Sequence, residues 1–199
     1  METLKTLDLN IFFWINGHHT PFLDKAMFAM THISFWLPLL LLAVYFLFRR
    51  YHKKTWTILL FFVLNAALTD RSSVMIKNWV QRPRPTRDLI LQDKVHVYVH
   101  ANGKEYRGGH YSFPSSHAAN SFGMVALFIF FLKPVTRHVW WIFPLWALIF
   151  CYTRMYLGVH YPTDICCGTL LGLLCGLLTI GLYRLWDSRH AKENQNIIT

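Results

Sequence analysis

Five long stretches of apolar residues, separated by short polar segments, organise this chain. They lie at about 32–48, 55–69, 114–132, 139–153 and 163–183. The best of them approach the ~20 residues that an α-helix needs to cross ~30 Å of hydrocarbon. The pattern therefore predicts an all-α fold, an integral membrane helical bundle with about five to six transmembrane helices.

Residues 3–16 follow a different pattern, in which apolar and polar positions fall on opposite faces of a helix. Leu4 and Leu7 lie on one face, and Lys5 and Asp8 lie on the other. A helix of this kind is typical of the membrane–water interface. We therefore expect an amphipathic N-terminal interfacial helix.

A second helical segment is predicted to begin near Thr20. Thr20 followed by Pro21 is typical of an N-cap and the first residue of a helix. The sequence leaves open whether residues 21–48 form one helix or two.

Composition supports the membrane prediction, because 54% of the residues are hydrophobic. The formal net charge of +10 could suggest a nucleic-acid partner. However, the basic residues lie between the apolar stretches and form no continuous basic face, so we expect no nucleic-acid partner. They gather in two loops and at the carboxyl end: Arg49, Arg50, Lys53, Lys54, Lys133, Arg137, Arg184, Arg189 and Lys192. By the positive-inside rule these segments are cytoplasmic, which places the amino terminus and residues 70–113 outside.

The chain is expected to form a single membrane-embedded domain over residues 1–199, with a cytoplasmic tail over about 186–199. Its last apolar stretch carries glycines at intervals of four: Gly168, Gly172 and Gly176. Such a stripe lets another helix approach closely. Packing within the chain and a homodimer face both fit this pattern.

Three groups of polar residues fall on the outer side. They are Lys77 and Arg84; Ser115, Ser116 and His117; and Arg154, His160 and Asp164. The loops that join the second to the third stretch and the fourth to the fifth emerge on the same face, so these groups can converge there.

Together the groups suggest oxyanion binding. The lysine and two arginines supply three positive charges, and an arginine fork matches phosphate oxygens. Ser115 and Ser116 open a helix, where free backbone N–H groups attract anions. His160 and Asp164 are four residues apart, so the carboxylate can hold one ring nitrogen and fix the tautomer.

Each group also has a plainer interpretation. Lys77 and Arg84 are compatible with charges that extend to the interface, and Ser115 with a helix cap. His160 and Asp164 are also metal-ligand types, but three fixed cations would oppose a divalent ion. We therefore expect no metal and no cofactor. The second arginine–proline pair, at Arg82, is interpreted as a loop charge.

The motifs K-x6-R-P, P-S-x-H and R-x5-H-x3-D, in this order, resemble the three-part signature of the type 2 phosphatidic acid phosphatase superfamily. The match covers residues 77–164, about 45% of the chain. The five-stretch plan resembles the short bacterial membrane lipid phosphatases of that family.

The resemblance implies that His160 is the nucleophile, Asp164 its orienting partner and His117 the general acid. It also implies that five residues hold the phosphate oxygens: Lys77, Arg84, Ser115, Ser116 and Arg154. Two positions depart from the family pattern. Ser116 stands where the family usually has glycine, and Thr153 stands where serine usually precedes the arginine.

We therefore expect a metal-independent lipid phosphatase that forms a phosphohistidine and hydrolyses a phosphate monoester or a diphosphate. Undecaprenyl diphosphate and a lipid A phosphate are favoured, ahead of phosphatidylglycerol phosphate and phosphatidic acid. The expected location is the bacterial inner membrane, with the site facing the periplasm or outside. The alternative is a catalytically silent lipid-phosphate-binding or scaffold membrane protein.

Overall fold

The computed structural model describes residues 2–196, and the regular structure in that part of the chain is helical. The seven α-helices are α1 (Glu2–Gly17), α2 (Pro21–Met30), α3 (Ile33–Tyr51), α4 (Thr55–Val80), α5 (Ser116–Leu132), α6 (Val139–Tyr156) and α7 (Pro162–Asn196). The predicted all-α fold is confirmed. Residues 197–199 of the predicted tail lie outside the described residues.

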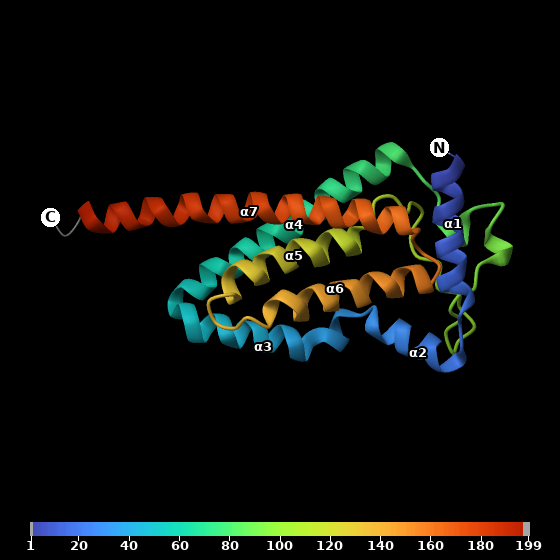
Figure 1. Ribbon diagram of the computed structural model, residues 1–199, viewed down its shortest axis with the longest axis horizontal. Coiled ribbons are helices and arrows are strands. Elements are labelled where there is room, and N and C mark those ends of the chain that lie inside the picture. Colours follow the sequence, from blue (N-terminus) through green and yellow to red (C-terminus); the bar gives the residue numbers. More distant parts are fainter. Residues whose placement is uncertain (1, 197–199) are drawn as a thin grey trace.

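Helices α3 to α7 run alternately up and down in one bundle, and α1 lies across one end of it (Figure 1). The long connection between α4 and α5 lies at the same end as α1. The α3–α4 turn, the α5–α6 loop and the carboxyl end of α7 lie at the opposite end. The basic segments therefore gather at the end away from α1, as the charge pattern predicted.

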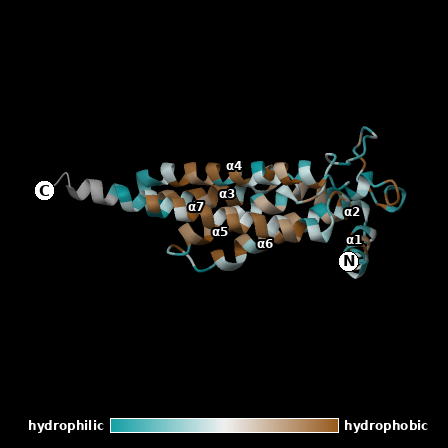
Figure 2. Cartoon of the chain, turned by 90° about the horizontal axis from the view of Figure 1, so that it is seen from above, coloured by the Kyte–Doolittle hydropathy of each residue, from teal (hydrophilic) through white to brown (hydrophobic). Residues whose placement is uncertain are grey.

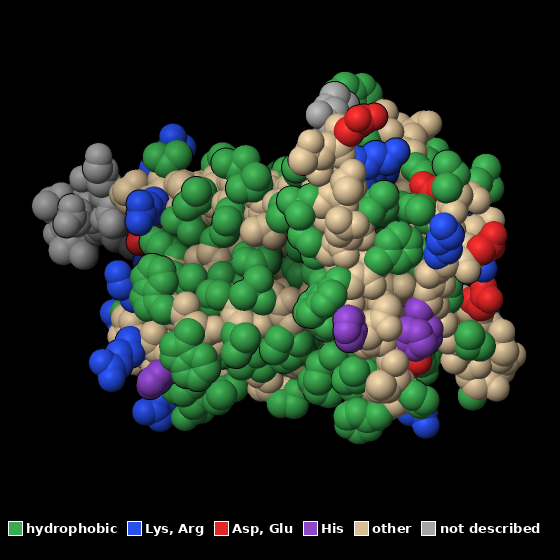
Figure 3. Space-filling model, turned by 45° about the vertical axis from the view of Figure 1, so that its right-hand side comes forward, with side chains coloured by type: hydrophobic (Ala, Val, Ile, Leu, Met, Phe, Trp, Pro, Cys, Tyr) green, Lys and Arg blue, Asp and Glu red, His purple; other side chains and the backbone are tan. Residues whose placement is uncertain are grey.

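Hydrophobic residues dominate the bundle between its two polar ends (Figure 2). Their side chains cover much of the face shown in Figure 3. Many large ones are exposed there: Leu41, Leu60, Val63, Leu145, Leu148, Leu170, Leu174 and Leu177. Two helical stretches are long and apolar enough to cross a membrane, namely Ile33–Val80, which holds both α3 and α4, and Pro162–His190. An apolar surface of this extent marks contact with another apolar phase.

The predicted start of the second helix is confirmed. Thr20 is the N-cap of α2, its hydroxyl accepts a hydrogen bond from the Leu23 backbone N–H at 3.2 Å, and Pro21 is the first helical residue. Helix α2 ends before Thr31, and α3 starts separately at Ile33. The segment 21–48 thus forms parts of two helices.

Helix α4 is longer than the apolar stretch that predicted it. It continues from Thr55 to Val80, so Lys77 lies in its last turn rather than beyond it. Polar residues do not end a helix by themselves, because their side chains can bond the helix backbone. Thr69 and Ser73 are fully buried, and their hydroxyls donate to backbone carbonyls of the preceding turn. The helix therefore carries Lys77 towards the end of the bundle where α1 lies.

Helix α5 occupies the middle of the bundle and packs most extensively against α7. The glycine stripe of α7 faces it. A methyl group on Gly168 would collide with the Ser115 carbonyl, and one on Gly172 would collide with the Ala119 carbonyl. Packing within the chain is confirmed. The alternative of a homodimer through Gly168, Gly172 and Gly176 is wrong, because α5 already occupies this face.

We predict that Gly172→Ala lowers the unfolding temperature, because the new methyl group forces α5 and α7 apart; overpacking typically costs about 1–3 kcal/mol. Gly181→Ala is the matched control on the same helix, since its methyl group meets no atom within 4 Å. The measurement is thermal unfolding in detergent. Equal unfolding temperatures for the two variants would contradict the close α5–α7 contact.

Candidate active site

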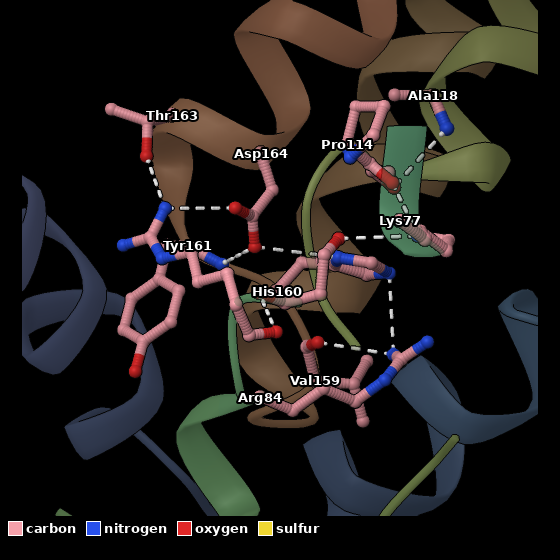
Figure 4. A network of polar contacts seen from close by, with 12 residues as sticks. Lys77, Arg84, Pro114, Ala118, Val159, His160, Tyr161, Thr163 and Asp164 are labelled. Atoms are coloured by element: carbon pink, nitrogen blue, oxygen red, sulfur yellow. Dashed lines mark hydrogen bonds and ion pairs between the residues drawn. The ribbon is translucent and has the colours of Figure 1, made fainter. Parts of the chain in front are cut away.

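The three polar groups of the sequence meet at the end of the bundle beside α1. Six elements or connections supply them: Lys77 from α4, Arg84 from the α4–α5 connection, Ser115 to His117 from the start of α5, Arg154 from α6, His160 from the α6–α7 connection and Asp164 from the first turn of α7. Figure 4 shows several of them joined by one network of polar contacts. The predicted convergence is confirmed.

His160 is fully buried and lies between an acidic and a basic side chain, although its Nδ1 makes no hydrogen bond among the described residues. Its Nδ1 lies 3.5 Å from Asp164 Oδ2, and its Nε2 lies 3.2 Å from an Arg84 guanidinium nitrogen. Arginine has only donors, so Nε2 accepts this bond with its lone pair. The ring proton therefore sits on Nδ1, on the side of the carboxylate.

The surroundings of His160 keep its ring neutral. Burial, together with the charges of Arg84 and Arg154, lowers the pKa of His160 well below its ordinary value. A neutral imidazole is the nucleophilic form of histidine, and here its Nε2 lone pair faces the Arg84 guanidinium.

Two buried arginines have hydrogen-bonding capacity to spare. Arg84 is 8% exposed and Arg154 is 2% exposed, and the Nε atom of each has no partner among the described residues. Burial and the neighbouring charge of Arg154 lower the pKa of Arg84 to about 10, which leaves it charged at neutral pH. Buried donors without partners are rare and indicate a ligand site.

The remaining bonds of the cations fix their positions. Arg154 donates to the Tyr106 hydroxyl at 2.8 Å and to the Thr31 hydroxyl. Lys77 donates to the Ser112 carbonyl at 3.2 Å and to the Pro114 carbonyl. All these acceptors are neutral, so three positive charges lie close together with Asp164 as the nearby carboxylate.

The start of α5 adds an anion-attracting helix end. Ser115 is its N-cap, and the hydroxyl accepts from the Ala118 N–H at 3.3 Å. The Ser115 N–H donates to the Asp164 carbonyl at 3.0 Å, which joins the start of α5 to the start of α7. The first-turn N–H groups of α5 have no partner inside the helix. The Ser116 hydroxyl turns to the Ser73 hydroxyl at 2.8 Å.

The rings of His117 and His160 lie near each other, with centroids 6.4 Å apart. A nucleophile reacts from about 3–3.5 Å, and a proton donor has to lie about 2.6–3.2 Å from the leaving oxygen. The two rings are therefore close enough for a phosphoryl group to lie between an attacking nitrogen of one and a proton donor of the other.

The interpretation of Arg82 as a loop charge is wrong. Its guanidinium donates to Asp164 Oδ1 at 2.8 Å and to Asp8 Oδ2 at 2.7 Å, and it lies 3.8 Å from the centre of the Tyr161 ring. Asp8 was expected on the polar outer face of α1, yet it is 5% exposed.

A signal for the burial of Asp8, though not for its partner, was present in the sequence. Asp8, Phe12 and Ile15 follow the helical spacing i, i+4, i+7, and all three are buried in the structure. The apolar face that contains Leu4 and Leu7 is the exposed one. The face of α1 that carries Asp8, Phe12 and Ile15 thus packs against the protein, and the face that carries Leu4 and Leu7 points to the surroundings.

A cavity of about 320 Å³ lies beside His117. Ser116, Asp70 and Asn120 line it together with apolar side chains that include Met124 and Trp146. The cavity is therefore mixed in character, with polar groups near the histidine and apolar groups further along the bundle.

In the described part of the chain no three histidine, cysteine, aspartate or glutamate side chains are placed to hold a metal ion. His160 and Asp164 are close together, but Lys77, Arg84 and Arg154 surround them, and their charges oppose a divalent cation. Independence from metal stays a prediction.

The model of the PAP2 superfamily matches residues 54–188, and the chain belongs to this superfamily. It is accordingly a phosphoric monoester hydrolase and a membrane lipid phosphatase. The family resemblance predicted from the three motifs is confirmed.

The chain is also similar to individual phosphatases of known sequence or structure. The lipid A 4′-phosphatase of Bacteroides thetaiotaomicron is 34% identical over 184 residues, which cover 89% of this chain and 77% of that protein. The crystal structure of Aquifex aeolicus LpxE is similar with a TM-score of 0.67 at 25% identity, covering 88% of this chain and 95% of that one. The transmembrane PAP2 type phosphatidylglycerolphosphate phosphatase from Bacillus subtilis gives a TM-score of 0.66 at 25% identity, covering 92% and 88%.

We predict that Arg84→Lys weakens binding of inorganic phosphate by about tenfold or more, because lysine keeps the charge but loses the planar fork and its spare Nε donor. Arg87→Lys is the matched control, since Arg87 is exposed in the same connection and bonds only the Gly108 carbonyl. The measurement is competitive inhibition by phosphate. Equal inhibition constants in both variants would contradict an oxyanion site at Arg84.

Proposed function

We propose that the protein removes a phosphate group from a membrane glycolipid, with a lipid A phosphate as the favoured substrate, through a phosphohistidine on His160. The observation that carries this proposal is the pair of histidines, with His160 Nε2 in contact with Arg84 and His117 across from it. The relative named as a lipid A 4′-phosphatase supports the substrate. Phosphatidylglycerol phosphate is the second candidate, supported by the similar structure from Bacillus subtilis.

In the first step, neutral His160 attacks phosphorus with its Nε2 lone pair and forms an N–P bond. The P–O bond to the lipid breaks, and His117 gives its proton to the departing oxygen, so that the lipid leaves as an alcohol. Asp164 holds the Nδ1 proton and stabilises the charge that develops on the ring.

In the second step, water attacks the phosphohistidine and gives a proton to His117. The N–P bond breaks, orthophosphate leaves, and His160 regains its lone pair. Five residues would hold the phosphate oxygens during both steps: Lys77, Arg84, Ser115, Ser116 and Arg154. Stabilisation by such fixed charges and N–H groups is the main source of catalysis in phosphoryl transfer.

The proposed setting is a bacterial inner membrane with the site on the periplasmic side. Helices α3 to α7 would cross the bilayer, α1 would lie in the interface with Leu4 and Leu7 towards lipid, and the basic end would face the cytoplasm. The cavity beside His117 would receive the part of the lipid next to the phosphate.

The test is release of orthophosphate from a panel of purified lipid phosphates, with and without excess chelator. We expect turnover on a lipid A phosphate and full activity in chelator, because side chains supply the positive charge. A catalytically silent binding protein would release phosphate from no lipid. Loss of activity in chelator, restored by zinc or magnesium, would sink the metal-free mechanism.

The two histidines should differ in their dependence on the leaving group. His160→Ala forms no phosphoenzyme and should lose turnover on every substrate. His117→Ala should lose about 10²–10⁴-fold on the lipid, the typical contribution of general acid catalysis, but much less on a nitrophenyl phosphate, whose leaving group needs no proton. Turnover and acid-quench trapping of phosphohistidine measure both effects. Equal losses on both substrates in His117→Ala would contradict its role as the acid.

The lowered pKa of His160 predicts the acid side of the pH profile. The nucleophile stays neutral until the pH falls below this lowered pKa, so kcat/KM should decline only well below pH ~6.5, the ordinary value for histidine. The profile has to be corrected for ionisation of the substrate phosphate, whose second pKa is about 6. A corrected decline centred at or above pH ~6.5 would show that burial and the arginines do not keep His160 neutral.

A further inference from the structure

Asp70 is an exposed carboxylate in the outer half of α4. It lies seven residues before Lys77, about 10 Å further along the bundle at 1.5 Å per residue. Among the described residues no basic group lies within ion-pair distance of it. Its carboxylate is therefore free to accept hydrogen bonds from a ligand.

The cavity that Asp70 lines also contains neutral donors. Trp146 is 3% exposed, lines the same cavity, and its Nε1 has no partner among the described residues. Asn120 Oδ1 is already occupied by the Thr69 hydroxyl, which leaves the Asn120 amide N–H groups as donors. The cavity thus combines one anionic acceptor with neutral donors, and its other side is apolar.

The position of the cavity determines which part of a substrate enters it. With phosphorus between the two histidines, the ester oxygen lies beside His117, so the atoms that follow it enter the cavity. The sugar of a glycolipid brings hydroxyl and amide groups there. A prenyl diphosphate would bring a second, anionic phosphate beside Asp70.

We propose that Asp70 accepts a hydrogen bond from a hydroxyl or amide N–H of the leaving group, and thereby selects lipid phosphate monoesters over lipid diphosphates. This inference rests on the proposed lipid phosphatase function and names its substrate class. The Trp146 N–H and the Asn120 amide complete the set by donating to oxygens of the same leaving group. A diphosphate is disfavoured because its second phosphate and the Asp70 carboxylate carry like charges and repel each other.

The test compares kcat/KM on a monophosphorylated disaccharide glycolipid and on a prenyl diphosphate. We expect the wild type to favour the monoester, and Asp70→Asn to reduce this preference by about tenfold to a hundredfold, the range for a hydrogen bond to a charged group. Asp93→Asn, exposed in the α4–α5 connection, is the matched control and should leave the preference unchanged. Trp146→Phe keeps an aromatic ring but removes the N–H along with part of the indole, and it should lower kcat/KM on the glycolipid alone.

The outcomes separate two failures. No phosphate release from either lipid by the wild type would overturn the proposed function itself. Turnover with an unchanged preference in Asp70→Asn, or an equal loss on both lipids, would overturn only the assignment of Asp70. If thermal unfolding shows that Asp70→Asn does not fold, Trp146→Phe provides the test. A loss on the glycolipid alone would support a recognition site in this cavity, and an equal loss on both lipids would overturn it.

A different observation concerns the acidic partner of His160. Arg82 lies between two carboxylates, Asp164 and Asp8, and its NH1 also donates to the Thr163 hydroxyl at 2.7 Å. Asp8 in turn accepts from the Thr163 N–H at 2.8 Å and from its hydroxyl at 2.8 Å. The Tyr161 N–H donates to Asp164 Oδ2 at 2.9 Å. Both oxygens of the Asp164 carboxylate are therefore bonded, Oδ1 by Arg82 from the α4–α5 connection and Oδ2 by Tyr161 from the connection before α7. Helix α1 acts through Asp8, which bonds Arg82.

We infer that Arg82 and Asp8 are positioning residues, which hold Asp164 in line with His160 Nδ1 and tie this alignment to helix α1. Neither residue reaches the phosphate side of His160. A misplacement of about 1 Å at a reacting centre costs on the order of 10²-fold. The effect should therefore appear in the rate of phosphohistidine formation and leave substrate binding as it is.

The test measures kcat and KM for Arg82→Met, Asp8→Asn and the double variant. We expect kcat to fall by about tenfold to a hundredfold with KM unchanged, partial rescue in Arg82→Lys, and no added loss in the double variant because the two residues act as one unit. Glu105→Gln, which breaks the exposed pair with Arg107, is the control and should change neither constant.

A merely structural role would lower the unfolding temperature and the active fraction without separating kcat from KM. Independent, additive losses in the double variant would also overturn the inference. Either result decides it, because burst titration of phosphohistidine counts the active molecules in each preparation.

Discussion

The site depends on three positive charges held close together in a largely buried part of the protein. Lys77, Arg84 and Arg154 are placed by bonds to neutral carbonyl and hydroxyl groups, and both arginines keep a buried Nε without a partner. Like charges in such surroundings repel strongly. The single carboxylate of Asp164 neutralises only part of the positive charge. The proposed phosphate would be the missing anion. Burial, together with the charges of the cations, also keeps His160 neutral, so the cations contribute both to proposed phosphate binding and to the state of the nucleophile.

The bundle provides this arrangement through the contact between α5 and α7. Glycines on α7 allow the start of α5 to approach until the Ser115 N–H bonds the Asp164 carbonyl at 3.0 Å. That bond fixes the anion-attracting end of α5 against the helix that carries the carboxylate. Packing in the apolar body of the protein thus sets distances among the polar groups at its end.

The sequence alone could predict the five long helices and the meeting of the three motifs, because apolar periodicity and loop sides depend on local patterns. It could not predict that Arg82 bonds Asp8, since an amphipathic pattern shows two faces of α1 but not which one meets the protein. The extent of α4 was missed for a similar reason. The Thr69 and Ser73 hydroxyls are buried by contacts with other helices, which hydropathy does not register. A prediction from hydropathy alone therefore ended α4 too early.

Charge in this molecule changes sign along the proposed reaction axis. Asp164 lies behind the nucleophile, the three cations surround the phosphoryl group, and Asp70 lies on the side of the leaving group. Positive charge in the middle stabilises the oxygens of the transferring group, which gain the most from fixed charges. Negative charge at the leaving side repels a second phosphate but attracts hydroxyl and amide hydrogens. A site with only cations would hold any phosphate, so the proposed discrimination among lipid phosphates comes from Asp70 rather than from the arginines.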